Sequence, residues 1–472
     1  MFIQQLYTDC LAEAAYYIES NGQAAIIDPM RDVKPYLELA AKRGATINYI
    51  FETHFHADFI SGHVDLANAT GATIVYGPMA NADYDIIVAK DYEEFILGAI
   101  RIRVLHTPGH TMESSCFLVL NEARQEHAVF TGDTLFVGDV GRPDIGVKFY
   151  LPKESLARHL YRSIHEKLMV LDDATIVYPG HGAGSSCGKK IEPQRSSTIG
   201  AQKQSNYALL ADSEDAFVKA ITKDLSPPPQ HFQDYIHINK TGGKPMQQVL
   251  EKANHPLTLA QFKEAMQEEN VILLDSRLHQ HFAKGHLPNS INIGLKGFFE
   301  VWASALIKDL NHPILLITAP DKAEETILHL ARVGFENILG HLDGGFRTWK
   351  NALETVEMIN NSCPIQLRGD LSQMAIIDVR SEAEYKRGHI SNAQNIPLEQ
   401  LESTLNQLDR NTEYFVYCQS GYRSMIATSI LKKAGFTQII NVKKGYEGII
   451  NPSKTCCCSK ALEASKEDIQ LS

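Results

Sequence analysis

The stretch ETHFHADFISGH, residues 52–63, places three histidines and an aspartate within twelve positions. Its central pattern is His54-x-His56-x-Asp58, and it directly follows the apolar segment INYIF. Imidazole and carboxylate groups suit borderline metals such as zinc and iron better than Ca²⁺ or Mg²⁺. We therefore predict a metal site at the end of a β-strand.

Residues of the same kind stand at the ends of later apolar segments: His110 in HTPGHT, Asp133 in TGDTLF and His181 in YPGHG. A lone histidine or aspartate is usually structural or lies on the surface, but four such junctions along one chain make coincidence implausible. Polar residues at strand-to-loop junctions predict a sheet whose loops converge on one site.

Length and composition restrict the function. A chain of 472 residues with 44% hydrophobic and 21% charged residues predicts a globular protein of two to four domains. A formal net charge of −11 argues against nucleic-acid binding. No apolar run approaches the roughly 20 residues that cross a bilayer, and the N-terminus lacks the pattern of a signal peptide. We therefore expect a cytoplasmic protein.

The second half of the chain contains an internal repeat. LLDSRLHQHFAKGHLPNSINI (273–293) matches IIDVRSEAEYKRGHISNAQNI (376–396) at constant spacing. Both copies alternate strand and helix patterns, which predicts two small parallel α/β domains. We expect domains at 1–240, 256–355 and 362–452, with a proline-rich linker at 225–232 and an extended segment at 237–245.

The second copy carries a cysteine loop. The apolar strand YFVY runs into CQSGYRS, residues 418–424, and then into a helix pattern. Cys418 would face backbone amides and a helix N-terminus, which favour a thiolate and bind anions. Gly421 allows the tight turn, and Arg423 adds positive charge.

The first copy lacks this loop chemistry. It has Thr318 in place of the cysteine, and Pro320 removes a loop amide. We expect this copy to be inactive and to serve as a packing or dimer surface in a homo-oligomer. The run Cys456, Cys457 and Cys458 near the C-terminus receives no function.

The metal motifs resemble the metallo-β-lactamase superfamily, in its glyoxalase II-like branch, across residues 1–240. The resemblance implies an αββα sandwich with the metal at one edge. Two-metal members bind the second ion through the aspartate and following histidine of H-x-H-x-D-H and through the late histidine. This chain keeps Asp58 and His181 but has Phe59 at the histidine position, so the second site should be crippled unless another residue substitutes.

Longer stretches refine the resemblance. ETHFHADFISGH, GRPD (141–144) and HGAGSSCGKKIEPQRSSTIGAQKQSNYAL (181–209) look like persulfide dioxygenases fused to rhodanese domains. That family implies one Fe(II) per chain, held by His54, His110 and Asp133. Two histidines and one carboxylate leave positions open for a thiolate and O₂. A single zinc ion in the same place would instead give a hydrolase.

The remaining candidates receive supporting roles. We expect His56, Asp58 and His181 to orient ligands or contact substrate. Arg142 and Asp144 should hold one another near the site, the alternative being a surface ion pair. Cys187 is either a sulfur acceptor or redox-sensitive thiol facing the pocket, or a packing residue.

The cysteine loop and its preceding motif resemble a rhodanese, a sulfurtransferase that carries sulfane sulfur as a cysteine persulfide. Four residues separate Cys418 from Arg423, one fewer than in related phosphatases, which favours sulfur over phosphate. The sequence thus predicts two rhodanese-like α/β domains, of which the second is active.

The resemblance implies a persulfide dioxygenase coupled to sulfur transfer. Its partners would be a small-molecule persulfide, O₂, and sulfite or thiosulfate, without nucleic acid or membrane. A zinc-dependent thioester hydrolase of glyoxalase II type is the main alternative, and a sulfur-carrier scaffold with a structural metal is a third. The thiol carrier, glutathione, coenzyme A or another, stays open, as does the direction of the sulfur-transfer step.

Overall fold

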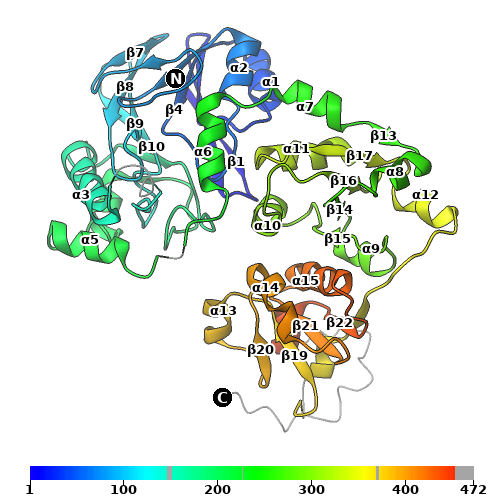
Figure 1. Cartoon of the computed structure of the whole chain (residues 1–472). Helices are drawn as coiled ribbons and strands as arrows, with labels where there is room; N and C mark the ends of the chain where they lie inside the picture. The colour runs from blue at the N-terminus through cyan, green and yellow to red at the C-terminus, as the bar shows by residue number, and fades with distance from the viewer. Residues whose placement is uncertain (146–150, 226, 368–370, 452–472) are drawn as a thin grey trace. The chain divides into compact units, whose positions relative to one another are not determined.

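The computed structural model describes residues 1–145, 151–225, 227–367 and 371–451 (Figure 1). The chain divides into two compact units, Met1–Val249 with Leu328–Phe335, and Leu250–Ile327 with Glu336–Ser472. No helix in the described ranges is long and apolar enough to span a bilayer. The cysteine run at 456–458 lies outside the described residues.

The first unit contains two six-stranded sheets. The first sheet has its strands in chain order, antiparallel up to the third strand and parallel from there on. Its strands are β1 (Phe2–Thr8), β2 (Glu13–Ser20), β3 (Gln23–Ile27), β4 (Thr46–Glu52), β5 (Thr73–Tyr76) and β6 (Ile87–Val88).

The second sheet has the order β12-β11-β10-β9-β8-β7. Its strands are antiparallel except for the pair β10 and β11. They are β7 (Glu94–Leu97), β8 (Ile100–His106), β9 (Ser115–Leu120), β10 (Glu126–Gly132), β11 (Ile176–Pro179) and β12 (Ser197–Thr198).

The two sheets pack face to face and helices cover their outer faces. Phe51, Phe117 and Phe130 lie in the buried cluster between the sheets. Helices α1 (Lys34–Arg43) and α2 (His63–Thr70) bury apolar residues against the outer face of the first sheet. Helices α3 (Lys153–Ser163) and α5 (Glu214–Thr222) do the same on the second sheet. The expected αββα sandwich is therefore confirmed.

The further helices are the π-helical turn Ile164–Leu168, α4 (Ile199–Ser205), α6 (Phe232–Thr241) and α7 (Met246–Ala253), of which α7 continues beyond the end of the first unit at Val249. Helix α6 corrects the sequence analysis, because residues 237–241 are helical rather than extended. It ends at Gly242, whose φ of 92° is favourable for glycine. The helical conformation places Asn239 against the loop that holds the metal motif.

The second unit contains two five-stranded parallel sheets with the same strand order, β13-β17-β16-β14-β15 and β18-β22-β21-β19-β20. This identity confirms that the repeat encodes two copies of one α/β fold. The strands are β13 (Pro256–Leu257), β14 (Ile272–Asp275), β15 (Ile291–Asn292), β16 (Ile314–Ile317), β17 (Ile338–Leu342), β18 (Asn360–Ser362), β19 (Ala375–Asp378), β20 (Ala393–Asn395), β21 (Tyr414–Tyr417) and β22 (Ile439–Val442).

Helices connect these strands. In the first copy they are α8 (Leu259–Ala265), α9 (His279–Ala283), α10 (Phe299–Leu306), α11 (Ala323–Arg332) and α12 (Phe346–Asn351). In the second copy they are α13 (Glu382–Arg387), α14 (Leu401–Thr404), α15 (Tyr422–Lys433) and α16 (Gly445–Ile450).

The repeated residues make the same contacts in both copies. Arg277 donates from Nε to Asp275 at 2.9 Å, and Arg380 donates from Nε to Asp378 at 3.0 Å. In each copy an asparagine amide donates to the backbone carbonyls of this Asp-x-Arg motif. These Asp, Arg and Asn residues thus stabilise the fold in both copies, and their repetition does not by itself indicate catalysis.

Candidate functional site

Three predicted ligands come together in the first unit. His54 follows β4, His110 follows β8 and Asp133 follows β10. All three are buried, and one ligand atom of each lies within 4.8 Å of the others. Two strands of one sheet and one strand of the other therefore bring residues far apart in sequence to a single point.

Both histidine rings are held from their Nδ1 side. Nδ1 of His54 lies 3.0 Å from the hydroxyl of Thr53, and Nδ1 of His110 lies 2.9 Å from the carbonyl oxygen of Arg142. Metal-binding histidines usually use one nitrogen for such a contact and the other for the ion. Nε2 of His110 indeed faces the carboxylate of Asp133, at 3.4 Å.

Buried polar atoms without partners mark the centre of this group. Nε2 of His110 and both carboxylate oxygens of Asp133 have no hydrogen-bond partner among the residues that the structure describes. A buried polar atom in that state costs free energy unless something satisfies it. A bound cation would satisfy all three atoms at once.

The electrostatics of the group also fit a metal. Burial lowers the pKa of His110 to about 4 and that of His54 well below its ordinary value, so both rings are neutral and can donate a lone pair. Burial, reinforced by the charge of Asp58, raises the pKa of Asp133 to about 8. A cation at this point would stabilise the Asp133 carboxylate that burial otherwise destabilises.

His56 is not among these three candidate ligands, although its ring lies beside that of His54, with centroids 4.3 Å apart. Its Nε2 is 3.1 Å from Asp28 and 3.2 Å from Glu52. Burial alone would lower the pKa of His56, but the two carboxylates outweigh it and raise that pKa well above its ordinary value. An imidazolium held between carboxylates has no lone pair for a metal at that nitrogen. Its ring packs on Phe59, with centroids 4.3 Å apart.

Sequence reasoning missed two carboxylates that organise this loop. Glu52 lies 3.1 Å from Nδ1 of His63 and accepts a hydrogen bond from Ser61, in addition to its contact with His56. Asp28 accepts hydrogen bonds from the amide and hydroxyl of Thr53, at 2.8 and 2.9 Å. Glu52 and His63 are the first and last residues of the stretch ETHFHADFISGH, and their place in the metal motif could have indicated that they support it.

Asn239 is a third missed residue. Its side-chain amide donates to the carbonyls of His56 and Phe59, both at 2.8 Å, and its oxygen accepts from the amide of Ser61 at 2.9 Å. These three bonds fix the backbone of the metal loop from a helix more than 170 residues away in the chain. No local pattern around Asn239 indicates this role.

Asp58, His181 and Cys187 form a neighbouring group, with ligand atoms within 4.8 Å of one another. Nε2 of His181 lies 2.8 Å from Asp58, and its Nδ1 lies 3.8 Å from Asp133. Burial raises the pKa of Cys187 well above its ordinary value, and the charges of Asp58 and Asp133 raise it further. Cys187 therefore lies beside the carboxylates of the site as well as in an apolar cluster.

We predict that Phe59→His increases the affinity for a second divalent ion at least about tenfold, because it supplies a nitrogen ligand beside Asp58 and His181. Titration of the metal-loaded protein with Zn²⁺ or Mn²⁺ measures this gain, with Phe59→Leu as a control that adds no ligand. No gain would show that Phe59 is not what empties the second site. A second ion already present in the unchanged protein and lost in Cys187→Ser would identify the thiol as the substitute ligand.

Arg142 and Asp144 hold one another as an ion pair. Arg142 donates from Nε and from its second terminal nitrogen to the two oxygens of Asp144, at 2.6 and 2.8 Å, and also to the carbonyl of Ser186. Arg142 is buried, so the pair is not a surface ion pair. Because the carbonyl of Arg142 contacts His110, this pair helps to fix a predicted ligand.

The cysteine loop in the second unit joins β21 to α15. Cys418 is buried, and its Sγ accepts the backbone amide of Gly421 at 3.1 Å. Sγ also lies 3.6 Å from the hydroxyl of Ser424. Gly421 has a φ of 103°, so glycine is favoured at this turn. The loop thus aims an amide at the sulfur, as the sequence pattern predicted.

Arg423 is paired within the same domain. Its two terminal nitrogens each donate to Glu384 at 2.7 Å. These hydrogen bonds lower the pKa of Glu384 to about 2. The ion pair therefore persists above about pH 2 and is lost only when the pH falls below this value and the carboxylate is protonated. A cavity of about 260 Å³ adjoins the loop and is lined by Arg380, Glu384, Arg387, Gly388, Gln419 and Tyr446.

The first copy has the same architecture without the thiol. Thr318 follows β16, where Cys418 follows β21 in the second copy. The structure therefore places the two residues at equivalent strand ends. Without sulfur at this position, the first copy cannot form a cysteine persulfide here.

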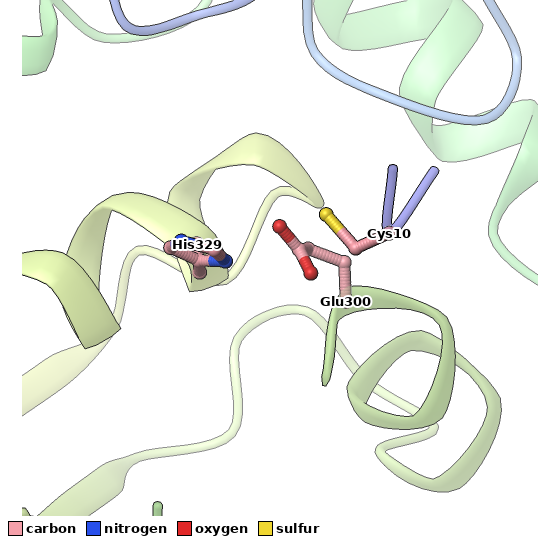
Figure 2. A group of neighbouring side chains, drawn as sticks. All are labelled: Cys10, Glu300 and His329. Carbon is pink, nitrogen blue, oxygen red and sulfur yellow. The ribbon is translucent and has the colours of Figure 1, made fainter. Parts of the chain in front are cut away.

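Three further side chains with metal-ligating groups, Cys10, Glu300 and His329, come from the turn after β1, from α10 and from α11 (Figure 2). Glu300 belongs to the second unit, whereas Cys10 and His329 belong to the first. We assign no site to them.

Comparison with known families finds matches in both halves of the chain. Residues 8–181 match the metallo-beta-lactamase superfamily, and residues 258–352 and 365–451 each match the rhodanese-like domain. These matches contain the three metal-ligand candidates and Cys418.

Comparison with individual proteins finds similar chains among solved structures and among curated proteins. A crystal structure called metallo-beta-lactamase, from Staphylococcus aureus subsp. aureus COL, is 31% identical, covers 72% of this chain and 98% of its own, and has a TM-score of 0.62. The probable hydroxyacylglutathione hydrolase glo2 of Schizosaccharomyces pombe is 36% identical over 33% of this chain. The present chain spans only 58% of the length of that curated relative.

Proposed function

We propose a function from one premise: the chain belongs to the metallo-β-lactamase superfamily and carries two rhodanese-like domains in tandem. We infer that the first domain is an iron-dependent persulfide dioxygenase. It oxidises the terminal sulfur of a low-molecular-weight persulfide to sulfite and releases the thiol. The last domain transfers sulfane sulfur through a persulfide on Cys418.

The observation that carries this proposal is the incomplete ligand set. His54, His110 and Asp133 present three ligand atoms, and Phe59 offers no fourth beside them. Two histidines and a carboxylate are the set used by non-haem Fe(II) oxygenases. When bound, Fe(II) would supply adjacent positions for a thiolate and O₂, which a closed structural site does not offer.

The protein itself would position the reactants. Asp58 and His181 hydrogen-bond to one another beside Asp133, so they can orient the substrate or hold a proton near the reacting sulfur. The ion pairs of the His56 imidazolium with Asp28 and Glu52 fix the conformation of the loop. The Phe59 ring, fully buried, adds an apolar wall that excludes water from the loop.

A zinc-dependent thioester hydrolase is the second candidate, because the curated relatives include hydroxyacylglutathione hydrolases. Hydrolases of this branch use the second-ion histidine that Phe59 replaces here. The tandem rhodanese-like domains also have no role in thioester hydrolysis. Both features favour the dioxygenase.

One experiment separates the candidates. The full chain is purified without oxygen, its metals are quantified, and O₂ uptake is followed after addition of glutathione persulfide. The dioxygenase predicts one iron per chain, with O₂ consumed and sulfite formed. The hydrolase predicts zinc, hydrolysis of a hydroxyacylglutathione and no O₂ uptake. Metal without either activity would favour a structural metal in a sulfur-carrier scaffold.

A further inference from the structure

Helix α15, which begins at the end of the cysteine loop, is buried along most of its length. Tyr422, Met425 and Ser429 recur at the spacing of one helix face. Met425 packs in a buried cluster with Phe282 and Ala283 of the first rhodanese-like copy. This face of the helix therefore contacts the inactive copy.

Two hydrogen bonds fix the contact. The hydroxyl of Ser429 accepts the backbone amide of Asn292 at 3.1 Å. The phenol of Tyr422 donates to the carbonyl oxygen of Gly294 at 2.7 Å. The amide of Asn292 lies in β15, and the carbonyl of Gly294 lies in the loop that follows this strand. The inactive copy thus holds α15 near its first turn and again two turns later.

The loop of the first copy is shaped to receive the tyrosine ring. A Cβ atom added to Gly297 would lie 2.7 Å from Cε2 of Tyr422, and one added to Gly294 would lie 3.5 Å from the same atom. Gly297 also has a φ of 146°, which side chains rarely adopt. The ring fits closely against Gly297, where a side chain would collide with it, whereas a Cβ at Gly294 would be at ordinary contact distance.

We propose that the inactive rhodanese-like copy positions the cysteine loop of the active copy, and that Tyr422 is the positioning residue. The inference rests on the proposed sulfur transfer through Cys418. Tyr422 directly follows Gly421, whose amide donates to the Cys418 sulfur, and directly precedes Arg423. Anchoring the phenol on Gly294 fixes the backbone that aims this amide.

The step that depends on this geometry is the transfer itself. The Cys418 thiolate attacks the outer sulfur of thiosulfate, the S–S bond of thiosulfate breaks, and sulfite leaves with the electron pair. Cyanide then takes the outer sulfur as thiocyanate and regenerates the thiolate. Loop amides stabilise the charge that moves onto the transferred sulfur, so a displaced loop should slow the reaction more than it weakens thiosulfate binding.

The test uses Tyr422→Phe in the full chain, which removes only the hydroxyl. We expect kcat for thiosulfate and cyanide to fall roughly five- to tenfold, the loss of one oriented hydrogen bond, while KM for thiosulfate changes less than about twofold. Every chain should still load one cyanide-labile sulfur. A merely structural role would instead reduce the number of chains that load sulfur and leave the rate per loaded chain unchanged.

Further variants test whether the effect is specific to the contact of Tyr422 with the first copy. Tyr385→Phe is the matched control, because its phenol donates over the same 2.7 Å distance to a carbonyl, that of Ala393, within the active copy. It should leave kcat unchanged. Gly297→Ala should slow transfer by displacing the ring, and should have little additional effect in a Tyr422→Ala background, because that background has no ring to displace.

Two outcomes would overturn the inference: an unchanged kcat in Tyr422→Phe, or additive effects of Gly297→Ala and Tyr422→Ala. Either leaves the proposed function intact as long as the unchanged protein transfers sulfur. Absence of sulfur transfer in the unchanged protein would instead refute the proposed function, and the inference with it.

Discussion

Asp133→Ala should remove bound iron and persulfide-dependent O₂ uptake together, by on the order of a hundredfold or more. Asp133 is the carboxylate of the three-residue ligand set, and both its oxygens are buried without a partner in the described part of the chain. Alanine leaves only His54 and His110, which cannot hold the ion tightly. The same change removes the negative charge that would balance the cation in a buried site.

Iron content and O₂ uptake with glutathione persulfide are measured on the same anaerobic preparation. Transfer of sulfur from thiosulfate to cyanide should stay at the level of the unchanged protein, which shows that the chain is folded. Asp133→Asn is the matched variant, since it keeps the shape of the side chain and removes its charge. If Asp133→Ala retains stoichiometric iron and normal turnover, the ligand assignment is wrong.

The grouping of the three candidate ligands could be predicted because each of them follows an apolar strand. His54, His110 and Asp133 follow β4, β8 and β10, and strand ends that converge on one edge are visible as junctions in the sequence. We could therefore predict that these side chains lie close together, because loops at the same edge of a sheet are expected to meet. The structure adds which ring nitrogen faces the centre, and it pairs His56 with Asp28 and Glu52.

The supports of the loop could not be predicted in the same way. Asn239 fixes the metal loop through bonds to backbone carbonyls, and such bonds depend on the approach of a distant helix rather than on any sequence spacing. The segment around it, residues 237–245, was expected to be extended. Gly242 and Gly243 in fact only end helix α6, which a glycine after the last turn commonly does.

The repeat predicted the fold of the second unit but gave limited information on function. The residues that match between copies include Asp275 and Asp378, whose contacts with a following arginine are the same in both. The proposed functional difference lies at Thr318 and Cys418, where the copies do not match. The contact between Tyr422 and the first copy involves residues outside the matching positions, so comparison of the copies could not have found it.

Cys418→Ser should abolish sulfur transfer from thiosulfate to cyanide and leave O₂ uptake with a free persulfide in place. Serine keeps the shape of the loop, but its hydroxyl stays protonated near neutral pH and cannot carry a persulfide. The loss should reach the background rate, because the thiol is the group that accepts the sulfur. O₂ uptake should persist because the candidate metal ligands His54, His110 and Asp133 lie in a different domain.

Together with Asp133→Ala, this variant tests whether the two chemistries are separable. The first copy supplies the control, since Thr318→Ala changes the equivalent strand end without removing a thiol and should leave transfer unchanged.

The products of persulfide oxidation should shift toward sulfite if the active copy normally consumes sulfite to form thiosulfate. Residual transfer in Cys418→Ser would locate the active thiol elsewhere, with Cys187 beside the metal group as the first candidate. Loss of O₂ uptake with free persulfide would instead show that the two sites act only as a relay, in which the persulfide must first form on Cys418.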